Sequence, residues 1–256
     1  MRSEERHREI MGDDDRLVGR VLTRREVLSM LGATGILWVT RCSGSGSLAS
    51  STDDELPAGC VVRPELTAGP YYVEEELNRS DIRSDPATGE VKAGTRLELA
   101  FHVSRIDAGA CLPLAGALVD VWHCDALGVY SDVQDPGFDT RGRKFLRGYQ
   151  ITDSDGIARF TTIYPGWYQG RAVHIHFKVR SAPDASTGYA FTSQLFFDDE
   201  LTDQVHTGNP YVSRGQRDVR NVQDGIFNQG GPGLVLDLTP AREGYATRFD
   251  IALQNV

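Results

Sequence analysis

Two histidines lie two residues apart in the segment AVHIHFKVR, residues 172–180, and their spacing could serve a metal ion. Side chains alternate between the two faces of a β-strand, so His174 and His176 share one face while Ile175 and Phe177 share the other. Neighbouring imidazoles on one face can bind the same ion, because histidine is the commonest metal ligand. The alternative is a water-exposed face, where an antiparallel sheet is expected to carry polar residues.

Tyrosines occur in two turns that precede this strand. Tyr130 lies in VWHCDALGVYSD, and Tyr164 and Tyr168 lie in TIYPGWYQG. A single tyrosine after a strand is ordinarily a rim aromatic with its hydroxyl in water. Two phenolate oxygens combined with two imidazole nitrogens form a hard, anionic donor set, which suits ferric iron better than zinc. The two turns and the histidine strand therefore predict a mononuclear iron site.

The elements that would position these side chains are short strands. Alternating segments separated by turn signals such as DSDG, PG and GGPG predict strands at residues 96–106, 116–123, 145–152, 157–163, 172–179, 191–197, 233–239 and 245–253. The only helix predicted after residue 55 is a short one at 198–206. Such spacing indicates a β-sandwich or a barrel, and we predict an all-β fold, a β-sandwich of mostly antiparallel strands with long loops and few short helices.

The N-terminal 55 residues have a different composition. Arg24 and Arg25 precede an apolar run from Val27 to about Val39, which a Ser/Gly linker follows. The run is shorter than the roughly 20 apolar residues that span a bilayer. A basic pair before a short apolar segment is typical of an export signal, here similar to the twin-arginine type, and the alternative is an ordinary helix. We predict a signal and linker at 1–55, a folded domain at 56–256, and export to the periplasm or the cell exterior.

Cysteine usage fits an exported protein. Export would allow a disulfide between two of Cys60, Cys111 and Cys124, and the sequence does not say which two pair. The alternative for each of them is an ordinary buried thiol. Cys42 lies where a lipid-anchored cysteine would lie, but Arg41 precedes it where such signals have a small residue. A lipid anchor at Cys42 is therefore the weaker expectation, and contact with a membrane is expected only through the signal or this anchor.

Composition bounds the class of protein. The 256 residues are 40% hydrophobic, which suits one globular domain with a sizeable core. The formal net charge is −9, and no Lys/Arg-rich run occurs beyond the N-terminal region, so no nucleic-acid partner is expected. Whether the chain forms a homo-oligomer stays open.

At this point the motifs resemble a known family. The segments RPELTAGPYY, WHCDALGVYSD and FLRGYQITDSDGIARFTTIYPGWYQGRAVHIHF are similar to the intradiol ring-cleavage dioxygenases, the family of protocatechuate 3,4-dioxygenase and catechol 1,2-dioxygenase. The likeness runs from about Arg63 to near the C-terminus and is strongest between Trp122 and Phe177. It implies that residues 56–256 form a catalytic domain with one non-haem Fe(3+). The implied reaction uses O2 to cleave a small aromatic diol between its hydroxylated carbons, giving a cis,cis-muconate-type diacid.

The same resemblance assigns the iron ligands. It implies that Tyr130, Tyr168, His174 and His176 bind the ion, with Tyr168 and His176 as the axial pair. Tyr168 is also expected to leave the metal and act as a base when substrate binds.

Further residues are assigned to the substrate. Arg171 would stabilise charge on the ring, Gln194 would lie near that ring, and Tyr72 would line the pocket. The insertion SAPDASTGYA makes the spacing to Gln194 longer than in well-known members. Gln169 and Gly170 replace the Pro-Trp that protocatechuate enzymes tend to carry, so the particular catechol is not assigned.

Two other functions fit parts of this pattern. One is a secreted β-sandwich binding module without catalysis, which would be expected to lack one of the four ligands, whereas all four are present. The other is a ferrous enzyme that uses His174 and His176 with a carboxylate from Asp125 or Asp132 and needs no tyrosinate.

Overall fold

The computed structural model describes residues 59–254, apart from 184 and 186–187. These residues belong to one compact unit, Leu56–Val256. The predicted export segment and Cys42 lie outside the described residues, and the boundary between 55 and 56 stays a prediction. No helix in the described part of the chain is long and apolar enough to cross a membrane.

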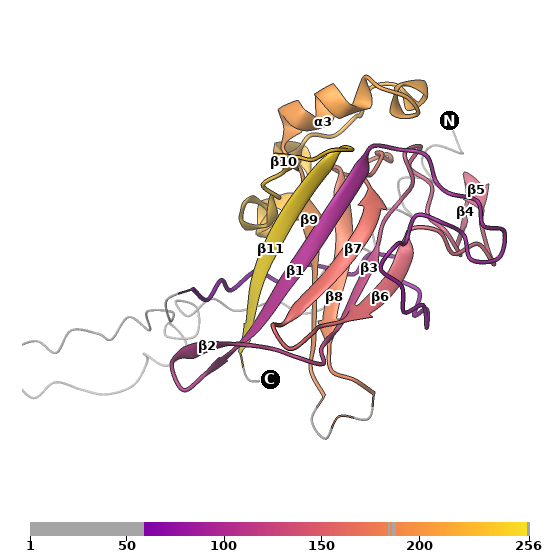
Figure 1. The fold of residues 1–256 in the computed structure, drawn as a ribbon. Helices are drawn as coiled ribbons and strands as arrows, with labels where there is room; N and C mark the ends of the chain where they lie inside the picture. The colour runs from indigo at the N-terminus through magenta and orange to yellow at the C-terminus, as the bar shows by residue number, and fades with distance from the viewer. Residues whose placement is uncertain (1–58, 184, 186–187, 255–256) are drawn as a thin grey trace, which may run out of the picture. The chain divides into compact units, whose positions relative to one another are not determined.

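Two β-sheets form the frame of the domain (Figure 1). In the first sheet the order is β10-β11-β1-β2, and β7 also pairs with β1. β1 and β11 run parallel, whereas β1 pairs antiparallel with β2 and β7. The strands are β1 (Arg96–Asp107), β2 (Ala110–Pro113), β7 (Ile157–Ile163), β10 (Thr239–Pro240) and β11 (Tyr245–Gln254).

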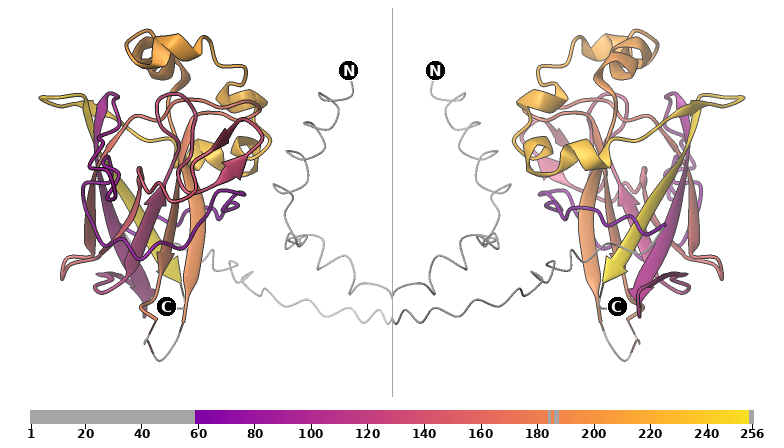
Figure 2. Two further views of the ribbon diagram at one scale, coloured as in Figure 1. Left: turned by 90° about the vertical axis from the view of Figure 1, so that its right-hand side faces the viewer. Right: turned by 90° about the vertical axis from the view of Figure 1, so that its left-hand side faces the viewer.

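The second sheet carries the histidine strand. Its order is β6-β3-β8-β9, and every neighbouring pair is antiparallel. The strands are β3 (Leu118–Trp122), β6 (Arg147–Ile151), β8 (His174–Arg180) and β9 (Ala190–Phe196). The side views in Figure 2 show the two sheets as separate layers. The predicted all-β sandwich of mostly antiparallel strands is therefore confirmed.

The hydrophobic core lies between the two layers. From β1 comes Phe101, whose ring centroid is 5.2 Å from that of Phe177 on β8 and 5.8 Å from that of Phe249 on β11. The apolar face that the sequence predicts for β1 is buried, and alternate residues of β8 join it. One face of β8 is therefore fixed in the core, which turns His174 and His176 to the outer face of the second sheet.

Most predicted elements are present, and one is wrong. The apolar segment 233–239 does not form a strand: η4 (Gly231–Leu234) is a 3-10 helix, and only an isolated bridge joins Val235 to Phe196. The preceding GGPG favours a tight turn over extended backbone. Three further short 3-10 helices occur at η1 (Tyr211–Arg214), η2 (Asn221–Gln223) and η3 (Phe227–Gln229).

The predicted short helix is confirmed as α3 (Asp199–His206). Asp198 precedes it, and its side-chain carboxylate accepts hydrogen bonds from the backbone N–H groups of Glu200 and Leu201 at 2.9 and 2.8 Å. This N-cap satisfies donors that have no partner within the helix. Two short strands, β4 (Gln134–Asp135) and β5 (Phe138–Asp139), form a separate hairpin.

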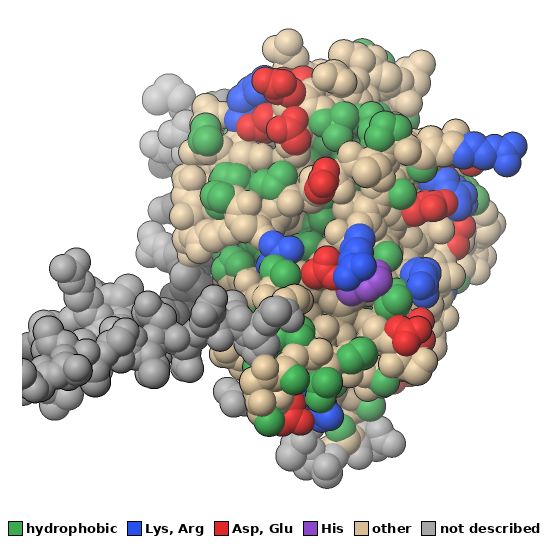
Figure 3. All heavy atoms as spheres, turned by 60° about the vertical axis from the view of Figure 1, so that its left-hand side comes forward, with side chains coloured by type: hydrophobic (Ala, Val, Ile, Leu, Met, Phe, Trp, Pro, Cys, Tyr) green, Lys and Arg blue, Asp and Glu red, His purple; other side chains and the backbone are tan. Residues whose placement is uncertain are grey.

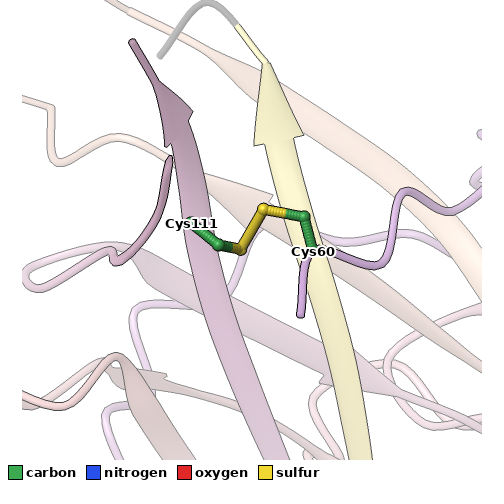
Figure 4. Close-up of a disulfide and its surroundings, with 2 residues drawn as sticks. All are labelled: Cys60 and Cys111. Carbon is green, nitrogen blue, oxygen red and sulfur yellow. A yellow bond between two sulfur atoms is a disulfide. The ribbon is translucent and has the colours of Figure 1, made fainter. Parts of the chain in front are cut away.

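The structure resolves which cysteines pair. Cys60 and Cys111 form a disulfide (Figure 4). It links the start of the described chain, which lies beside β11, to β2. Cys124 is a free thiol and is buried. Its Sγ donates a weak hydrogen bond to the carbonyl oxygen of Gly166, 3.5 Å away.

Candidate metal centre

The two histidines of β8 are buried, and the exposed-face alternative is wrong for both. His174 is 2% exposed and His176 is 1% exposed. In the sheet register, His176 lies opposite Trp122 on β3 and opposite Gln194 on β9. The indole ring of Trp122 stacks on the imidazole of His176, with centroids 5.1 Å apart and planes 5° apart.

Three donor atoms converge at this point of the sheet. The Nε2 atoms of His174 and His176 are 3.0 Å apart, and the Tyr168 hydroxyl is 3.2 Å from His174 Nε2. His174 Nδ1 donates to the carbonyl oxygen of Ala172 at 2.6 Å, which leaves a lone pair on Nε2. A hydrogen bond of this kind fixes the ring orientation of a metal-binding histidine.

Tyr130 completes the cluster from the opposite turn. Its ring centroid is 5.7 Å from that of Tyr168 and 6.2 Å from that of His176. The two tyrosine-bearing turns contact each other closely because of two glycines. A Cβ at Gly128, where φ is +83°, would lie 2.2 Å from the Trp167 carbonyl oxygen, and a Cβ at Gly166 would lie 2.3 Å from that of Ala126.

The electrostatics of the cluster suit a cation. Burial, followed by the charge of Arg171, lowers the pKa of His174 to about 3. Burial, followed by His174, lowers the pKa of His176 as well, so both imidazoles are neutral and able to bind a metal at neutral pH. Burial, followed by the nearby Tyr168, raises the pKa of Tyr130. A phenolate at this position therefore needs a bound cation, and the four donors fit an ion such as ferric iron.

The carboxylate-based alternative does not fit. Among the described residues, no group of three or more His, Cys, Asp or Glu side chains could hold a metal. Asp125 Oδ1 accepts from the backbone N–H groups of Leu127 and Val129, and its Oδ2 lies 3.1 Å from Lys92 Nζ. Asp132 Oδ1 accepts from the Gly142 N–H at 2.6 Å. Both carboxylates therefore already have partners away from the two histidines.

Arg171 and Gln194 lie together beside the histidines. The Arg171 guanidinium donates through Nη2 to Gln194 Oε1 at 2.6 Å and through Nε to Asp224 Oδ2 at 3.0 Å. Gln194 Nε2 donates to the Thr67 carbonyl oxygen at 2.9 Å. Despite the longer spacing, Gln194 lies opposite His176 in the β8–β9 register, because the inserted residues follow β8.

Asp224 is a site residue that the sequence did not reveal. Burial would raise the pKa of this carboxyl group, but the charge of Arg171 and the Ala172 N–H, 2.8 Å away, outweigh burial and lower it. Asp224 therefore fixes the direction of Arg171. No sequence motif predicts this contact, because Asp224 is 53 residues from Arg171 along the chain.

The segment GPYY places its two tyrosines differently. Tyr72 contacts Trp122 at a centroid distance of 4.8 Å, and Lys178 Nζ lies 3.7 Å from its ring centroid. Burial, followed by Asp120 and Glu74, raises the pKa of Tyr72 to about 12. Tyr71, which the sequence analysis did not select, stacks on Tyr130 at 4.4 Å. The pocket-lining role of Tyr72 stays a prediction.

Sequence comparison finds relatives along most of the domain. A family model described as Dioxygenase matches residues 67–254. The protocatechuate 3,4-dioxygenase beta chain of Burkholderia cepacia is 30% identical over 203 residues, which cover 72% of this chain and 76% of that protein. The chlorocatechol 1,2-dioxygenase of Pseudomonas putida is 33% identical over 116 residues, 38% of this chain and only 42% of the relative's length.

Solved structures agree with this match. An intradiol ring-cleavage dioxygenase from Tetranychus urticae superposes with a TM-score of 0.66 and 28% identity, over 77% of this chain and 96% of that chain. The dioxygenase domain of a dioxygenase carbohydrate-binding protein fusion from Streptomyces sp. SirexAA-E superposes with a TM-score of 0.53 and 27% identity, over 77% of this chain and all of that chain (100%). The chain belongs to the intradiol ring-cleavage dioxygenase family.

Proposed function

We propose that this protein is an intradiol dioxygenase that binds one non-haem Fe(3+) through Tyr130, Tyr168, His174 and His176. It uses O2 to cleave a catechol-type diol between its two hydroxylated carbons and releases a cis,cis-muconate-type diacid. The observation that carries the proposal is that His176 Nε2 and the Tyr168 hydroxyl both lie within 3.2 Å of His174 Nε2. The family typically uses non-haem Fe(III), which agrees with this donor set.

The chemistry divides between the ion and the protein. Ferric iron, when bound, supplies the Lewis acidity that favours a deprotonated diol. Tyr168, which is partly exposed, accepts a proton from one substrate hydroxyl through its phenolate oxygen, 3.2 Å from His174 Nε2. Tyr130 is fully buried and stays in place as a ligand.

Arg171 acts on the ring rather than on the ion. Its guanidinium stabilises the negative charge that develops on the substrate ring, and the fixed contacts to Asp224 and Gln194 remove the need for reorganisation during the reaction. Aromatic side chains pack around Tyr130, and this apolar surface favours the exclusion of water beside the proposed ligands.

Export is the second part of the proposal. It is supported by Arg24 and Arg25 before a short apolar run and by the Cys60–Cys111 disulfide, a bond that persists in oxidising compartments.

The function is tested on purified, iron-loaded protein. A tyrosinate bound to ferric iron absorbs visible light, so the protein should be red to burgundy and should consume O2 when catechol is added. His176→Ala should lose most of the bound iron, because it removes one of four protein donors. His102→Ala is the matched control: His102 lies on β1 of the other sheet, opposite Asp250 on β11, and its loss should leave the iron content unchanged. Elemental analysis of both variants gives the comparison.

Two results would contradict the proposal. A colourless ferric protein would exclude tyrosinate ligands. Full iron retention in His176→Ala would remove that histidine from the site.

A further inference from the structure

Tyr71 connects the candidate metal centre to a carboxylate at its rim. Its ring stacks on Tyr130, with centroids 4.4 Å apart and planes 24° apart, and meets Tyr168 edge-on at 6.0 Å. Its hydroxyl donates to Asp135 Oδ2 at 2.7 Å. One phenol ring therefore separates the Asp135 carboxylate from the two tyrosines that are proposed to bind iron.

The position of Asp135 is built into the fold. Asp135 ends β4, and Oδ1 of its side chain accepts from the Gly137 N–H at 2.9 Å in the tight turn to β5. Phe138 at the start of β5 packs on the cluster of Trp122, Cys124 and Tyr130. The β4–β5 hairpin, which stands apart from both sheets in Figure 1, therefore holds this carboxylate over the edge of the aromatic cluster.

The charge of Asp135 is not cancelled by a neighbouring cation. Among the described residues, no Lys, Arg or His nitrogen lies within 4.0 Å of its carboxylate. Other carboxylates near the site differ: Asp224 pairs with Arg171 at 3.0 Å, and Asp125 pairs with Lys92 at 3.1 Å. Even on the same hairpin, the exposed Asp139 pairs with Arg141 at 2.6 Å.

We propose that Asp135, held by Tyr71, is a specificity-determining residue that selects catechols whose ring carries no anionic substituent. The inference rests on the proposed function, since that function places the substrate beside Tyr130 and Tyr168. A carboxylate on the substrate ring experiences repulsion from Asp135 in a partly desolvated site, whereas an uncharged substituent of the same size does not. The Asp135 carboxylate thus disfavours 3,4-dihydroxybenzoate, whereas catechol and 3,4-dihydroxybenzamide are accepted.

The test compares two ligands that differ in charge and hardly in shape. For the wild-type protein, kcat/KM with 3,4-dihydroxybenzamide should exceed that with 3,4-dihydroxybenzoate by about five- to tenfold, the range expected for one partly screened charge pair. Anaerobic calorimetry, which measures binding without turnover, should give a lower dissociation constant for the amide than for the benzoate. Because the repulsion is electrostatic, raising the salt concentration should narrow both ratios.

Two variants assign the effect to one carboxylate. Asp135→Asn should reduce the preference for the amide to about twofold or less, since it removes the charge and keeps the side-chain size. Asp139→Asn makes the same change on the same hairpin, at an exposed position already paired with Arg141, and should keep the wild-type ratio.

The outcomes separate this inference from the proposed function. Turnover of the benzoate at least as efficient as that of the amide, or a ratio insensitive to salt, overturns the role of Asp135 and leaves the dioxygenase intact. Absence of O2 uptake with every diol overturns the proposed function. In that case the calorimetric ratio and its salt dependence, compared between the wild type, Asp135→Asn and Asp139→Asn, still decide whether Asp135 discriminates by charge.

Discussion

His123 shows how a buried side chain next to the site couples stability to pH. Its ring nitrogens lie 2.7 Å from the Cys124 carbonyl oxygen and 2.6 Å from the Thr162 hydroxyl, so the neutral ring satisfies both contacts by donating through Nδ1 and accepting at Nε2. Burial lowers the pKa of His123 to about 4. The unfolded chain, with a histidine pKa of about 6.5, therefore binds the proton more tightly than the folded protein does.

The sign of the pH dependence follows from that difference. The free energy of unfolding should fall as pH drops from about 6.5 toward the folded-state value of about 4. Between about pH 7.5 and pH 5, His123→Gln should lose roughly 2 kcal/mol less stability than the wild type, because glutamine takes up no proton. Urea unfolding at both pH values measures this, and the difference at the higher pH serves as the control for lost packing. Parallel pH curves for the two proteins would show that His123 does not titrate on unfolding.

Sequence reasoning at this scale succeeds where one strand sets the geometry. His174 and His176 could be predicted to share a face because the period of a strand is two residues. Tyr71, Asp135 and Asp224 could not be found in the same way, since each lies on a loop or at a strand end and meets partners far away in sequence. Tyr71 and Asp135, for example, are 64 residues apart.

At the scale of elements, the turn that carries Tyr168 is held from one side by α3 and η1. His206 Nε2 donates to the Pro165 carbonyl oxygen at 3.1 Å, and the Trp167 indole N–H donates to the Gly215 carbonyl oxygen at 3.1 Å. The Tyr211 hydroxyl donates to the Tyr164 carbonyl oxygen at 2.7 Å. The helical segment after β9 therefore helps to position the turn between β7 and β8.

Tyr211→Phe should weaken this connection. The hydroxyl of Tyr211 also accepts from the Thr95 N–H at 2.9 Å, so its removal leaves two backbone groups without a partner in a buried region. The expected loss is roughly 1 to 3 kcal/mol in the free energy of unfolding, measured with urea. Tyr149→Phe is the matched control, because Tyr149 is half-buried on β6 and no hydrogen bond of its hydroxyl occurs among the described contacts. Equal stability of the two variants would show that the Tyr211 bridge contributes nothing.

The elements themselves differ in how far the sequence predicts them. β1 and β8 carry long alternating patterns that match burial on one face. Residues 233–239 alternate as well, and Leu234 and Leu236 are buried, yet the backbone there is a 3-10 turn followed by loop. Alternation reports burial, whereas a strand also needs a neighbour to pair with. Within 233–239, only Val235 and the last residue, Thr239 of β10, have such a partner among the described residues.

At the scale of the whole molecule, the described surface carries paired charges of opposite sign. On the face shown in Figure 3, acidic and basic side chains lie beside one another instead of gathering by sign. Exposed pairs such as Arg248 with Asp250, 2.6 Å apart, illustrate the pattern. The formal net charge of the chain is −9, so that nucleic acid is not a partner stays a prediction from the sequence.

The disulfide gives the export proposal a chemical reporter within the folded domain. Replacement of both Arg24 and Arg25 by lysine should hold the chain in the cytoplasm, since the paired arginines are the feature that marks the signal type. There Cys60 and Cys111 should stay reduced, because cytosolic thiol systems prevent stable disulfides. Alkylation of the denatured protein should then label both cysteines, as detected by mass spectrometry. In wild-type protein from the exported fraction, neither Cys60 nor Cys111 should be labelled.

An internal standard and a control variant accompany that measurement. Cys124 is a free, buried thiol and should be labelled in both proteins once they are denatured. Arg20→Lys changes one arginine upstream of the pair and should leave both export and the disulfide unaltered. If the Arg24→Lys, Arg25→Lys protein were exported as efficiently as the wild type, the signal would not depend on the arginine pair. If wild-type protein carried the Cys60–Cys111 bond while still inside the cytoplasm, the bond would no longer support export, and the localisation would rest on the N-terminal sequence alone.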